Sequence, residues 1–379
     1  MSDNASQYPR IAIAHDYLTQ RGGAEKVVLT LARAFPAAPI FTTLYDPART
    51  YPEFQKRDIR VSGLNRIALL RKFHRLALPV LAIAASGIKV EAEATIVSSS
   101  GWAHGFRSSG PKIVYCYSPA RWLYQTDAYF ATRRLTARRL ALSALAPLLR
   151  RWDKKQAATA TKYFAISTAV QQRIREVYGI ESEVLPAPHS IDAGLPQEAV
   201  DVSPLSADGG GFYLCISRLL PYKNVDVVIN AFNLLGRPLV VVGTGPEERK
   251  LQNAAGPSIV FLKNLDDSQI RWLYAQCRAV VSASYEDFGL TPIEAAAFGK
   301  PSVVLRWGGF LDTIREGETG LYFDRPDAGK IAEAVSASEL QTWDADLLRQ
   351  HATCFSEEKF IQRLAAELEA RKSAGGRVG

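Results

Sequence analysis

Two basic residues follow an apolar, strand-like segment in the second half of the chain. Arg218 and Lys223 come shortly after Phe212–Ile216. Arginine offers a planar fork to phosphate oxygens, and lysine offers a movable point charge. Ligands of parallel α/β sheets bind beyond the carboxyl ends of the strands. The two residues therefore predict an anion site there, and together they could neutralise a diphosphate.

Two carboxylates follow another strand-like segment, Ala279–Ser282. Glu286 is expected in a loop, where a carboxylate beside a phosphate is unfavourable unless it grips hydroxyl groups; the alternative is an ordinary acidic loop residue. Glu294 falls in the expected helix Thr291–Phe298, whose first residues also fit a capping box, so local structure alone could explain it. The start of this helix, after Gly289, would offer backbone N–H groups to the same anion.

Paired glycines mark two further turns. Gly22 and Gly23 precede the expected helix Ala24–Ala34, where they would let a phosphate or sugar approach the backbone. A tight strand-to-helix turn needs glycine for steric reasons as well. The Gly-Thr-Gly at 243–245 lacks the third glycine of a dinucleotide fingerprint, because Glu248 occupies that position. The sequence therefore disfavours an NAD site.

Strand-like and helix-like segments alternate along the whole chain, which predicts an α/β fold with two doubly wound, Rossmann-like parallel sheets. A polar, glycine-rich break at 203–211 follows two prolines near 186–188, so we expect the hinge between Pro186 and Gly211. The predicted parts are an N-terminal domain, 1–186, a C-terminal domain, 187–355, and a C-terminal helix and tail, 356–379, that packs back toward the N-terminal domain. A central cleft between the two domains is the default site.

Composition narrows the class of protein. With 379 residues, 47% hydrophobic and 22% charged, the chain is neither disordered nor collagenous. Its four widely spaced cysteines suggest neither a disulfide framework nor a zinc ribbon, and no acidic pair or His/Cys set is spaced to hold a metal. The polar start, MSDNASQYPR, is unlike a signal peptide, and Leu76–Ile88 is too short to span a bilayer. We therefore expect a cytoplasmic protein.

The charge is concentrated in one half of the chain. Residues 1–186 hold 27 basic and 13 acidic residues, whereas 187–379 hold 19 and 25. The segment 133–155 combines arginine pairs with leucines, as in an amphipathic helix lying on an anionic membrane. Nucleic acid, a phosphorylated substrate and a merely solvated helix face are the alternatives. The arginines in question are Arg133, Arg134, Arg138 and Arg139.

The surrounding motifs resemble a known family. YEDFGLTPIEAAAFG, Tyr285–Gly299, contains Glu-x7-Glu and is similar to the signature of the retaining, family 4 glycosyltransferases of GT-B fold. The resemblance covers most of the chain. SRLLPYKNVDVVINAF, VVGTGPE and GGFLDTIREGETGLYF resemble that family in order and spacing, and AHDYLTQRGGAEKVV, SSSGWAHGF and YCYSPARWLY resemble its bacterial polysaccharide mannosyltransferases.

The resemblance implies roles for the donor-side residues. Arg218 and Lys223 would hold the nucleotide diphosphate, Glu286 would contact the hydroxyl groups of the donor sugar, and Glu294 would bind the ribose. The remaining residues expected at the nucleotide sugar are Gly22, Gly23, Gly289, Leu290 and Thr291.

The resemblance also implies an acceptor side. His104, in a glycine-rich loop after the strand Thr95–Ser98, would face the sugar and belong to the catalytic set. Relatives often read Cys-His-(Ser/Thr)-Pro where this chain has Tyr117 between Cys116 and Ser118, so a histidine is missing near the acceptor. Tyr117, Arg121, Arg133, Arg134, Arg138 and Arg139 are expected on the acceptor or membrane side.

The implied activity is retaining transfer of a hexose, most directly mannose from GDP-mannose, onto a hydroxyl of a lipid-linked saccharide in polysaccharide biosynthesis. No metal or other cofactor and no nucleic acid would take part, and the protein would lie in the cytoplasm or at the inner face of the membrane. The alternatives are a UDP-sugar-dependent transferase of the same fold, a sugar-nucleotide epimerase, a dinucleotide-dependent oxidoreductase, and a non-catalytic protein that binds nucleic acid or an anionic surface.

Overall fold

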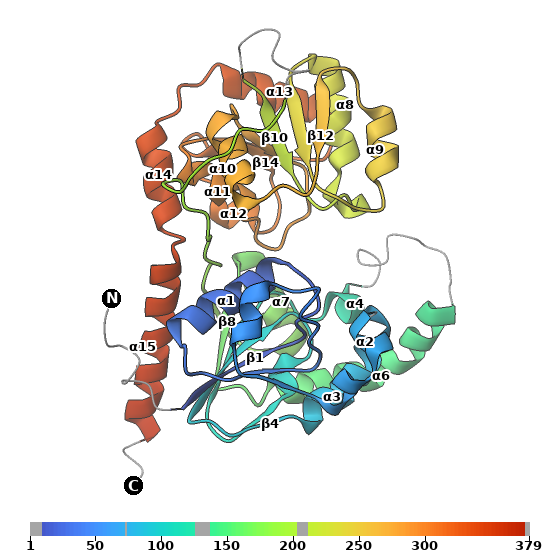
Figure 1. Ribbon diagram of the computed structural model, residues 1–379, viewed down its shortest axis with the longest axis vertical. Helices are drawn as coiled ribbons and strands as arrows, with labels where there is room; N and C mark the ends of the chain where they lie inside the picture. The colour runs from blue at the N-terminus through green and yellow to red at the C-terminus, as the bar shows by residue number, and fades with distance from the viewer. Residues whose placement is uncertain (1–9, 73, 126–136, 203–210, 376–379) are drawn as a thin grey trace. The chain divides into compact units, whose positions relative to one another are not determined.

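The computed structural model describes residues 10–72, 74–125, 137–202 and 211–375 (Figure 1). The chain divides into two compact units: unit 1 is Met1–Ala187 together with Glu357–Gly379, and unit 2 is Pro188–Ser356. Each unit is built on one large parallel sheet, so the predicted α/β class with two parallel sheets is confirmed. Part of the predicted hinge, 203–210, lies outside the described residues.

Unit 1 contains a seven-stranded parallel sheet in the order β3-β2-β1-β5-β7-β8-β9. The central strand β1 is buried along its whole length, as expected of a parallel sheet covered on both faces. A separate pair, β4 and β6, is also parallel. The strands are β1 (Ile11–His15), β2 (Ile40–Thr42), β3 (Ile59–Val61), β4 (Lys89–Val90), β5 (Ala94–Ser99), β6 (Arg107–Ser108), β7 (Lys112–Cys116), β8 (Lys162–Ala165) and β9 (Glu183–Val184).

The helices of unit 1 include one from the far end of the sequence. Helix α15 belongs to this unit because Phe360 packs edge-on against Tyr115 of β7, 5.1 Å between ring centroids, and Arg363 pairs with Glu183 of β9. The helices are α1 (Gly23–Ala34), α2 (Ala68–Lys72), α3 (His74–Gly87), α4 (Arg121–Tyr124), α6 (Ala137–Ala157), α7 (Thr168–Tyr178) and α15 (Glu357–Gly375), with 3-10 turns η1 (Pro52–Lys56), η2 (Gly63–Arg66) and η3 (Ala103–Gly105).

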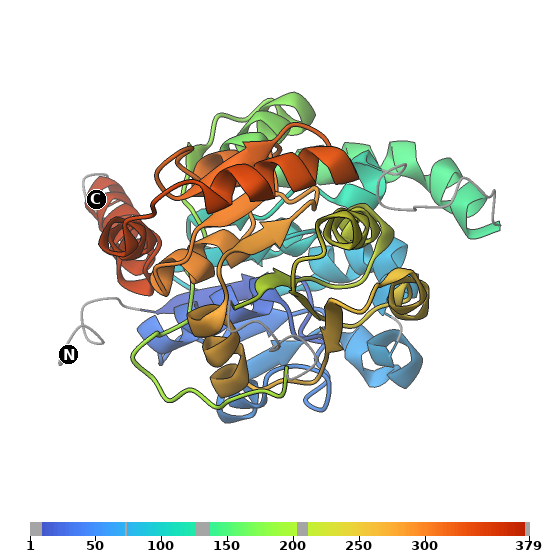
Figure 2. The same ribbon diagram turned by 90° about the horizontal axis from the view of Figure 1, so that it is seen from above.

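Helix α6 lies beside α3, which in turn touches α2. Figure 1 shows these three helices gathered on one side of unit 1, and Figure 2, seen from above, shows α6 extending outward from the unit. None of the helices within the described residues combines the length and apolar composition needed to cross a bilayer.

Unit 2 contains a six-stranded parallel sheet in the order β12-β11-β10-β13-β14-β15. Successive side chains of its central strands point into the apolar cores on opposite faces of the sheet, as in other doubly wound folds. The strands are β10 (Tyr213–Ile216), β11 (Leu239–Val242), β12 (Ile259–Leu262), β13 (Val280–Ser282), β14 (Ser302–Leu305) and β15 (Gly320–Phe323).

Two apolar cores sandwich this sheet. One packs Phe232 of α8 and Val335 of α13 against Val241, and the other packs Tyr274 of α10 and Phe298 against the opposite face. The helices are α8 (Val225–Leu235), α9 (Glu248–Ala254), α10 (Asp267–Gln276), α11 (Thr291–Ala297), α12 (Phe310–Thr313), α13 (Ala328–Glu339) and α14 (Ala345–Thr353), with the 3-10 turn η5 (Pro221–Lys223).

Candidate functional site

Three loops meet at the carboxyl edge of the unit 2 sheet, one after each of β10, β13 and β14. The backbone N–H of Gly309 donates to the carbonyl of Glu286 at 3.0 Å, and the N–H of Tyr285 donates to the carbonyl of Tyr222 at 3.3 Å. The Tyr285 ring also packs edge-on against Trp307, with 5.1 Å between ring centroids. The loop that carries Glu286 is therefore held between its two neighbours.

Glycines make this close packing possible. Gly289 has a φ of +86°, and a Cβ there would lie 2.4 Å from the Phe310 ring. A Cβ on Gly309 would lie 2.1 Å from the Cα of Phe288. A larger residue at either position would push the loops after β13 and β14 apart. The glycines of YEDFG and GGF thus have a packing role that is independent of any ligand.

Lys223 and Glu286 form the centre of this edge. The Lys223 ammonium donates to Oε1 of Glu286, with the lysine side chain 7% exposed and the glutamate side chain 27% exposed. The ammonium also lies 5.0 Å from the centroid of the Tyr222 ring. The structure thus brings together a cation and a carboxylate that the sequence had associated only through their strand ends.

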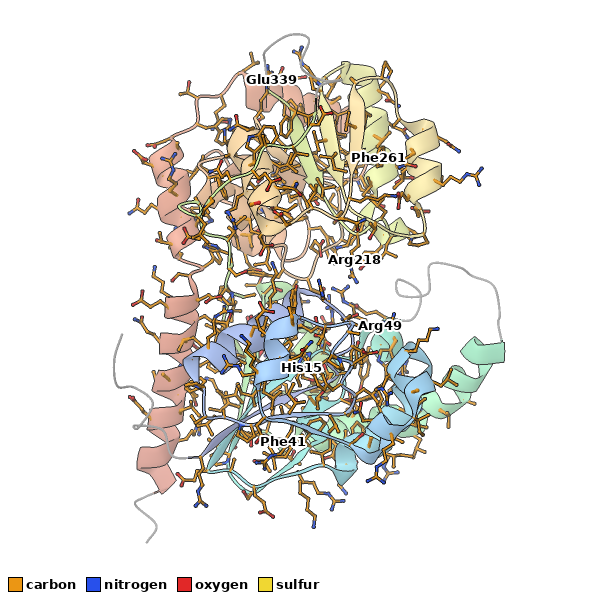
Figure 3. The ribbon with its side chains drawn as sticks, in the orientation of Figure 1. His15, Phe41, Arg49, Arg218, Phe261 and Glu339 are labelled. Carbon is orange, nitrogen blue, oxygen red and sulfur yellow. The ribbon has the colours of Figure 1, made fainter. Side chains whose placement is uncertain are left out.

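Arg218 lies at the same edge but remains exposed (Figure 3). Its guanidinium donates to the Tyr222 hydroxyl at 3.1 Å, so one ring connects the two basic residues. Two cations that contact the same tyrosine are suited to bind the oxygens of a diphosphate.

Glu294 differs from the prediction. The capping box is wrong: the residue before the helix is Leu290, with no side-chain cap, and Pro292 is the second helical residue. The carboxylate of Glu294 instead accepts a hydrogen bond from the Tyr274 hydroxyl at 2.6 Å. Burial and the neighbouring Glu294 raise the pKa of Tyr274, which keeps this hydroxyl protonated as a donor. Long-range packing, not local capping, orients Glu294.

The backbone groups predicted to face phosphate lie beside this carboxylate. Gly289 and Leu290 precede α11, and Thr291 is its first residue. First-turn N–H groups have no acceptor within their own helix.

The glycines of the loop after β11 have a packing role. A Cβ on Gly243 would strike the carbonyl of Ser217, and one on Gly245 would strike the carbonyl of Leu219. Among the described residues, no cluster of three or more His, Cys, Asp or Glu side chains could hold a metal ion.

In unit 1, the loop 99–106 wraps around a buried carboxylate at the carboxyl edge of the sheet. Asp16 accepts hydrogen bonds from the backbone N–H groups of Ser100, Trp102 and Ala103 at 2.5, 2.8 and 2.6 Å. Lys112 donates to the carbonyls of the same loop, at His104 and Phe106. Burial lowers the pKa of Lys112 to about 8. The loop backbone is therefore fixed by one buried anion and one buried cation.

His104 lies inside unit 1, with 2% of the residue exposed. Its Nε2 lies 2.8 Å from Oδ1 of Asp153 in α6, and its Nδ1 lies 3.3 Å from the Ser99 hydroxyl. Both ring nitrogens thus face protein groups. A direct role facing the sugar stays a prediction, and the buried ring favours an indirect one.

The Gly22–Gly23 turn at the start of α1 lies against a second buried pair, His15 and Glu25. Nε2 of His15 lies 3.8 Å from Glu25, and Nδ1 lies 3.0 Å from the Ser98 hydroxyl. Gly22 leaves room for Glu25, whose Oε2 would lie 2.7 Å from a Cβ at that position. Burial lowers the pKa of His15, but its interactions with the negative charges of Glu25 and Asp16 outweigh burial, so the pKa is raised.

The remaining predicted residues lie nearby or beyond the described part. The Tyr117 hydroxyl is 2.9 Å from that of Ser98 and donates to the Ala24 carbonyl, and burial raises its pKa, so it stays protonated. Arg121 is half-buried at the start of α4. Arg133 and Arg134 lie outside the described residues; Arg138 and Arg139 belong to α6, but their side chains are likewise outside the description.

Several charged residues of these networks were missed from the sequence. Asp16 and His15 carried a usable signal, since they stand directly after an apolar strand at the ligand edge. Asp153 carried a weaker one, as the only acid in the basic helix α6. Nothing local pointed from Tyr274 to Glu294, because twenty residues of separation hide that contact.

The raised pKa of His15 predicts a pH dependence. The charged pair with Glu25 stabilises the fold fully below the unfolded pKa of about 6.5, and this stabilisation is lost as pH rises through the higher folded value. We expect wild type to exceed His15→Gln in melting temperature by more at pH 6 than at pH 9. The melting temperature of Glu25→Gln should likewise approach that of wild type as pH rises. A constant difference between wild type and His15→Gln across this range would contradict the pairing.

Comparison with known proteins supports the family. A family model described as Glycosyltransferase Family 4 matches residues 21–193, and one described as Glycosyl transferases group 1 matches residues 197–347. The fold is similar to that of the crystal structure of Anabaena Alr3699/HepE in complex with UDP, with a TM-score of 0.68 and 17% sequence identity. The superposition covers 95% of this chain and 100% of the Anabaena chain. This likeness confirms the predicted fold.

Two named relatives are mannosyltransferases. Alpha-1,3/1,6-mannosyltransferase ALG2 is 28% identical over 36% of this chain and 39% of its own in Dictyostelium discoideum, and 26% identical over 83% of both chains in Homo sapiens. The GDP-mannose-dependent alpha-(1-6)-phosphatidylinositol monomannoside mannosyltransferase of Mycolicibacterium smegmatis is 31% identical over 32% of this chain. The chain spans less than two fifths of that enzyme's length, 37%. With the two family models covering both units, the chain belongs to the family 4 glycosyltransferases of GT-B fold.

Proposed function

We propose that this protein transfers a hexose from a nucleoside-diphosphate sugar to a hydroxyl group, with GDP-mannose as donor and a lipid-linked saccharide as acceptor. The observation that carries the proposal is the buried ammonium of Lys223 at the carboxyl edge of unit 2, beside Glu286 and near Arg218. The printed names of relatives support mannose, and one of them specifies GDP-mannose and a phosphatidylinositol-linked acceptor.

Donor binding would exchange the partner of Lys223. A buried ammonium needs a negative partner, and in the free protein Glu286 supplies it. A diphosphate offers the same ammonium two anionic groups. Glu286 would then be released to accept hydrogen bonds from the sugar hydroxyls. This exchange lets a carboxylate and a phosphate occupy one small site without both competing for the lysine.

The same cations would assist departure of the nucleoside diphosphate. Negative charge grows on the leaving phosphate as the glycosidic bond breaks, and fixed cations stabilise it more strongly than they stabilise the bound substrate. The acceptor hydroxyl would attack from the face that the phosphate leaves, which retains the anomeric configuration. Its proton passes to the departing phosphate oxygen. Lys223 and Arg218 are the groups of this chain that we assign to charge stabilisation.

A panel of nucleotide sugars tests the donor. We expect GDP-mannose to raise the melting temperature and to be turned over, because the bound donor stabilises the folded protein. UDP-glucose, UDP-galactose and ADP-glucose serve as matched comparisons. A response to a UDP sugar alone would overturn the GDP-mannose assignment and leave the transferase. Conversion of the donor to an isomeric nucleotide sugar without an acceptor would indicate an epimerase.

Loss of either cation should abolish most turnover. Lys223→Ala and Arg218→Ala should each lower kcat/KM by on the order of 100-fold, as removal of transition-state charge stabilisation does. Lys330→Ala is the matched control, because Lys330 pairs with Glu333 on the exposed surface of α13. Near wild-type turnover in either of the first two variants, with folding intact, would contradict the diphosphate assignment.

The Tyr274 hydroxyl should matter for donor affinity through Glu294. Both Glu294→Gln and Tyr274→Phe should weaken donor binding, since one removes the ribose acceptor and the other its orienting hydrogen bond. Tyr213→Phe is the matched control: its hydroxyl donates to Glu339 at 3.0 Å, and Figure 3 shows Glu339 at the end of unit 2 opposite Arg218. Calorimetric titration with the donor measures the effect. Unchanged affinity in Glu294→Gln would remove Glu294 from the donor site.

A lipid-linked acceptor implies contact with a membrane. The adjoining helices α2, α3 and α6 expose large apolar side chains: Leu69 is 61% exposed, Ile83 is 74% and Leu148 is 68%. Basic side chains accompany them on α6, where Arg151 and Lys155 are exposed. Apolar side chains among cations suit the interface of an anionic bilayer.

Vesicle sedimentation tests this surface. Wild type should sediment with vesicles of phosphatidylglycerol and phosphatidylcholine at low salt and be released by high salt. The variants Ile83→Asn with Leu148→Asn, and Arg151→Glu with Lys155→Glu, should stay in the supernatant. Leu340→Asn is the control, because Leu340 is 90% exposed in unit 2. Wild type that never sediments would contradict membrane docking and leave the donor chemistry untouched.

A further inference from the structure

Asp153 is a carboxylate with no exposed surface, held in helix α6. Its Oδ2 accepts hydrogen bonds from the hydroxyls of Tyr124 and Tyr178, each at 2.9 Å. Its Oδ1 lies 2.8 Å from Nε2 of His104. A buried carboxylate is costly unless such partners surround it. Helices α4, α6 and α7 and the loop 99–106 thus meet at one anion.

The two tyrosines fix which oxygen faces the histidine. Burial and the charge of Asp153 raise the pKa of both Tyr124 and Tyr178, so their hydroxyls remain protonated. Both donate to Oδ2, which leaves Oδ1 for His104. Nε2 and Oδ1 lie 2.8 Å apart without forming an aligned hydrogen bond in the structure, a separation that is repulsive between two lone pairs and attractive with a proton on Nε2. In that tautomer Nδ1 is the acceptor for the hydroxyl of Ser99, 3.3 Å away.

The ring of His104 is the link between α6 and the loop. Asp16 and Lys112 bind the backbone of the loop, whereas the side chain of His104 contacts Asp153 in a separate helix, α6. Trp152, next to Asp153, adds packing: its ring lies 5.0 Å from that of Trp102, and a Cβ on Gly105 would lie 2.6 Å from it. Ser99 ends β5 at the edge where ligands of parallel sheets bind.

We propose that Asp153 is a positioning residue for glycosyl transfer: it holds His104 with its proton on Nε2 and thereby fixes the loop 99–106 at the carboxyl edge of unit 1. His104 then acts through the loop it orients, because its ring is buried and both of its nitrogens lie against protein groups. The effect on turnover rests on the proposed function, whereas the position of the proton does not.

Asp153→Asn tests the link, because an amide offers one acceptor and one donor. The two tyrosine hydroxyls should keep the amide oxygen, so the NH2 group would face His104. The ring must then carry its proton on Nδ1 and donate it to Ser99. Nitrogen-15 NMR of histidine-labelled protein distinguishes the two tautomers, and His104→Gln identifies the signal among the five histidines. We expect the Nε2–H form in wild type and the Nδ1–H form in Asp153→Asn.

Turnover supplies the second readout. Asp153→Leu, which offers His104 neither an acceptor nor a donor and so releases the loop, should lower kcat by at least about 10-fold while leaving donor affinity within about twofold, since a positioning residue affects rate without contributing a binding group. Tyr178→Phe should move both the histidine signal and kcat in the same direction, to a smaller extent. Tyr163→Phe is the matched control: its buried hydroxyl has no hydrogen-bond partner among the described residues, and its ring lies 6.2 Å from that of Tyr178.

The outcomes distinguish the Asp153–His104 pairing, the positioning role and the proposed function from one another. An unchanged His104 tautomer in Asp153→Asn overturns the proposed pairing. A folded Asp153→Leu with unchanged kcat overturns the positioning role. If wild type binds and turns over no nucleotide sugar, the proposed function fails, and the tautomer measurement still decides the Asp153–His104 link. A changed tautomer in Asp153→Asn with lower kcat in Asp153→Leu, and no change in Tyr163→Phe, supports the proposal.

Discussion

The ammonium of Lys223 is almost completely withdrawn from water, and its contact with Glu286 is what makes that burial possible. The desolvation of an unpaired ion costs several kcal/mol. The surrounding loops follow from this requirement. Gly289 and Gly309 let the loops after β13 and β14 close on each other, and this closure holds Glu286 against the lysine. For the proposed donor site, this arrangement means that the cation is already positioned before an anion arrives.

Unit 1 uses the same principle with the signs reversed. Asp16 and Asp153 are buried carboxylates, and each gathers donors from a different part of the unit. Asp16 organises a backbone, whereas Asp153 organises side chains from two other helices and one loop. Lys223 and Asp16 lie at the carboxyl edges of their parallel sheets, where strand ends converge. At both edges a buried charge holds the neighbouring loop by hydrogen bonds.

The sequence predicted what depends on local pattern. Helix α1 and strand β13 lie within one residue of the predicted Ala24–Ala34 and Ala279–Ser282, since apolar periodicity acts over a few residues. The prediction of an anion site after β10 came from residue type and strand order, and the structure places Arg218 and Lys223 in that loop. The capping box at Glu294 failed because Tyr274 binds that carboxylate from another helix. The interior place of His104 depends on Asp153, nearly fifty residues away, and no local pattern contains that contact.

Hydrogen exchange with and without donor tests the central claim most directly, because it reports binding residue by residue without requiring an acceptor. On saturation with GDP-mannose, the account predicts slower amide exchange in the segments 217–225 and 283–297, which carry Lys223 and Glu286, and unchanged exchange in helix α13 (Ala328–Glu339). Lys223→Ala should lose this protection. Saturation that leaves both segments unchanged, with protection confined to other parts of the chain, would contradict the account.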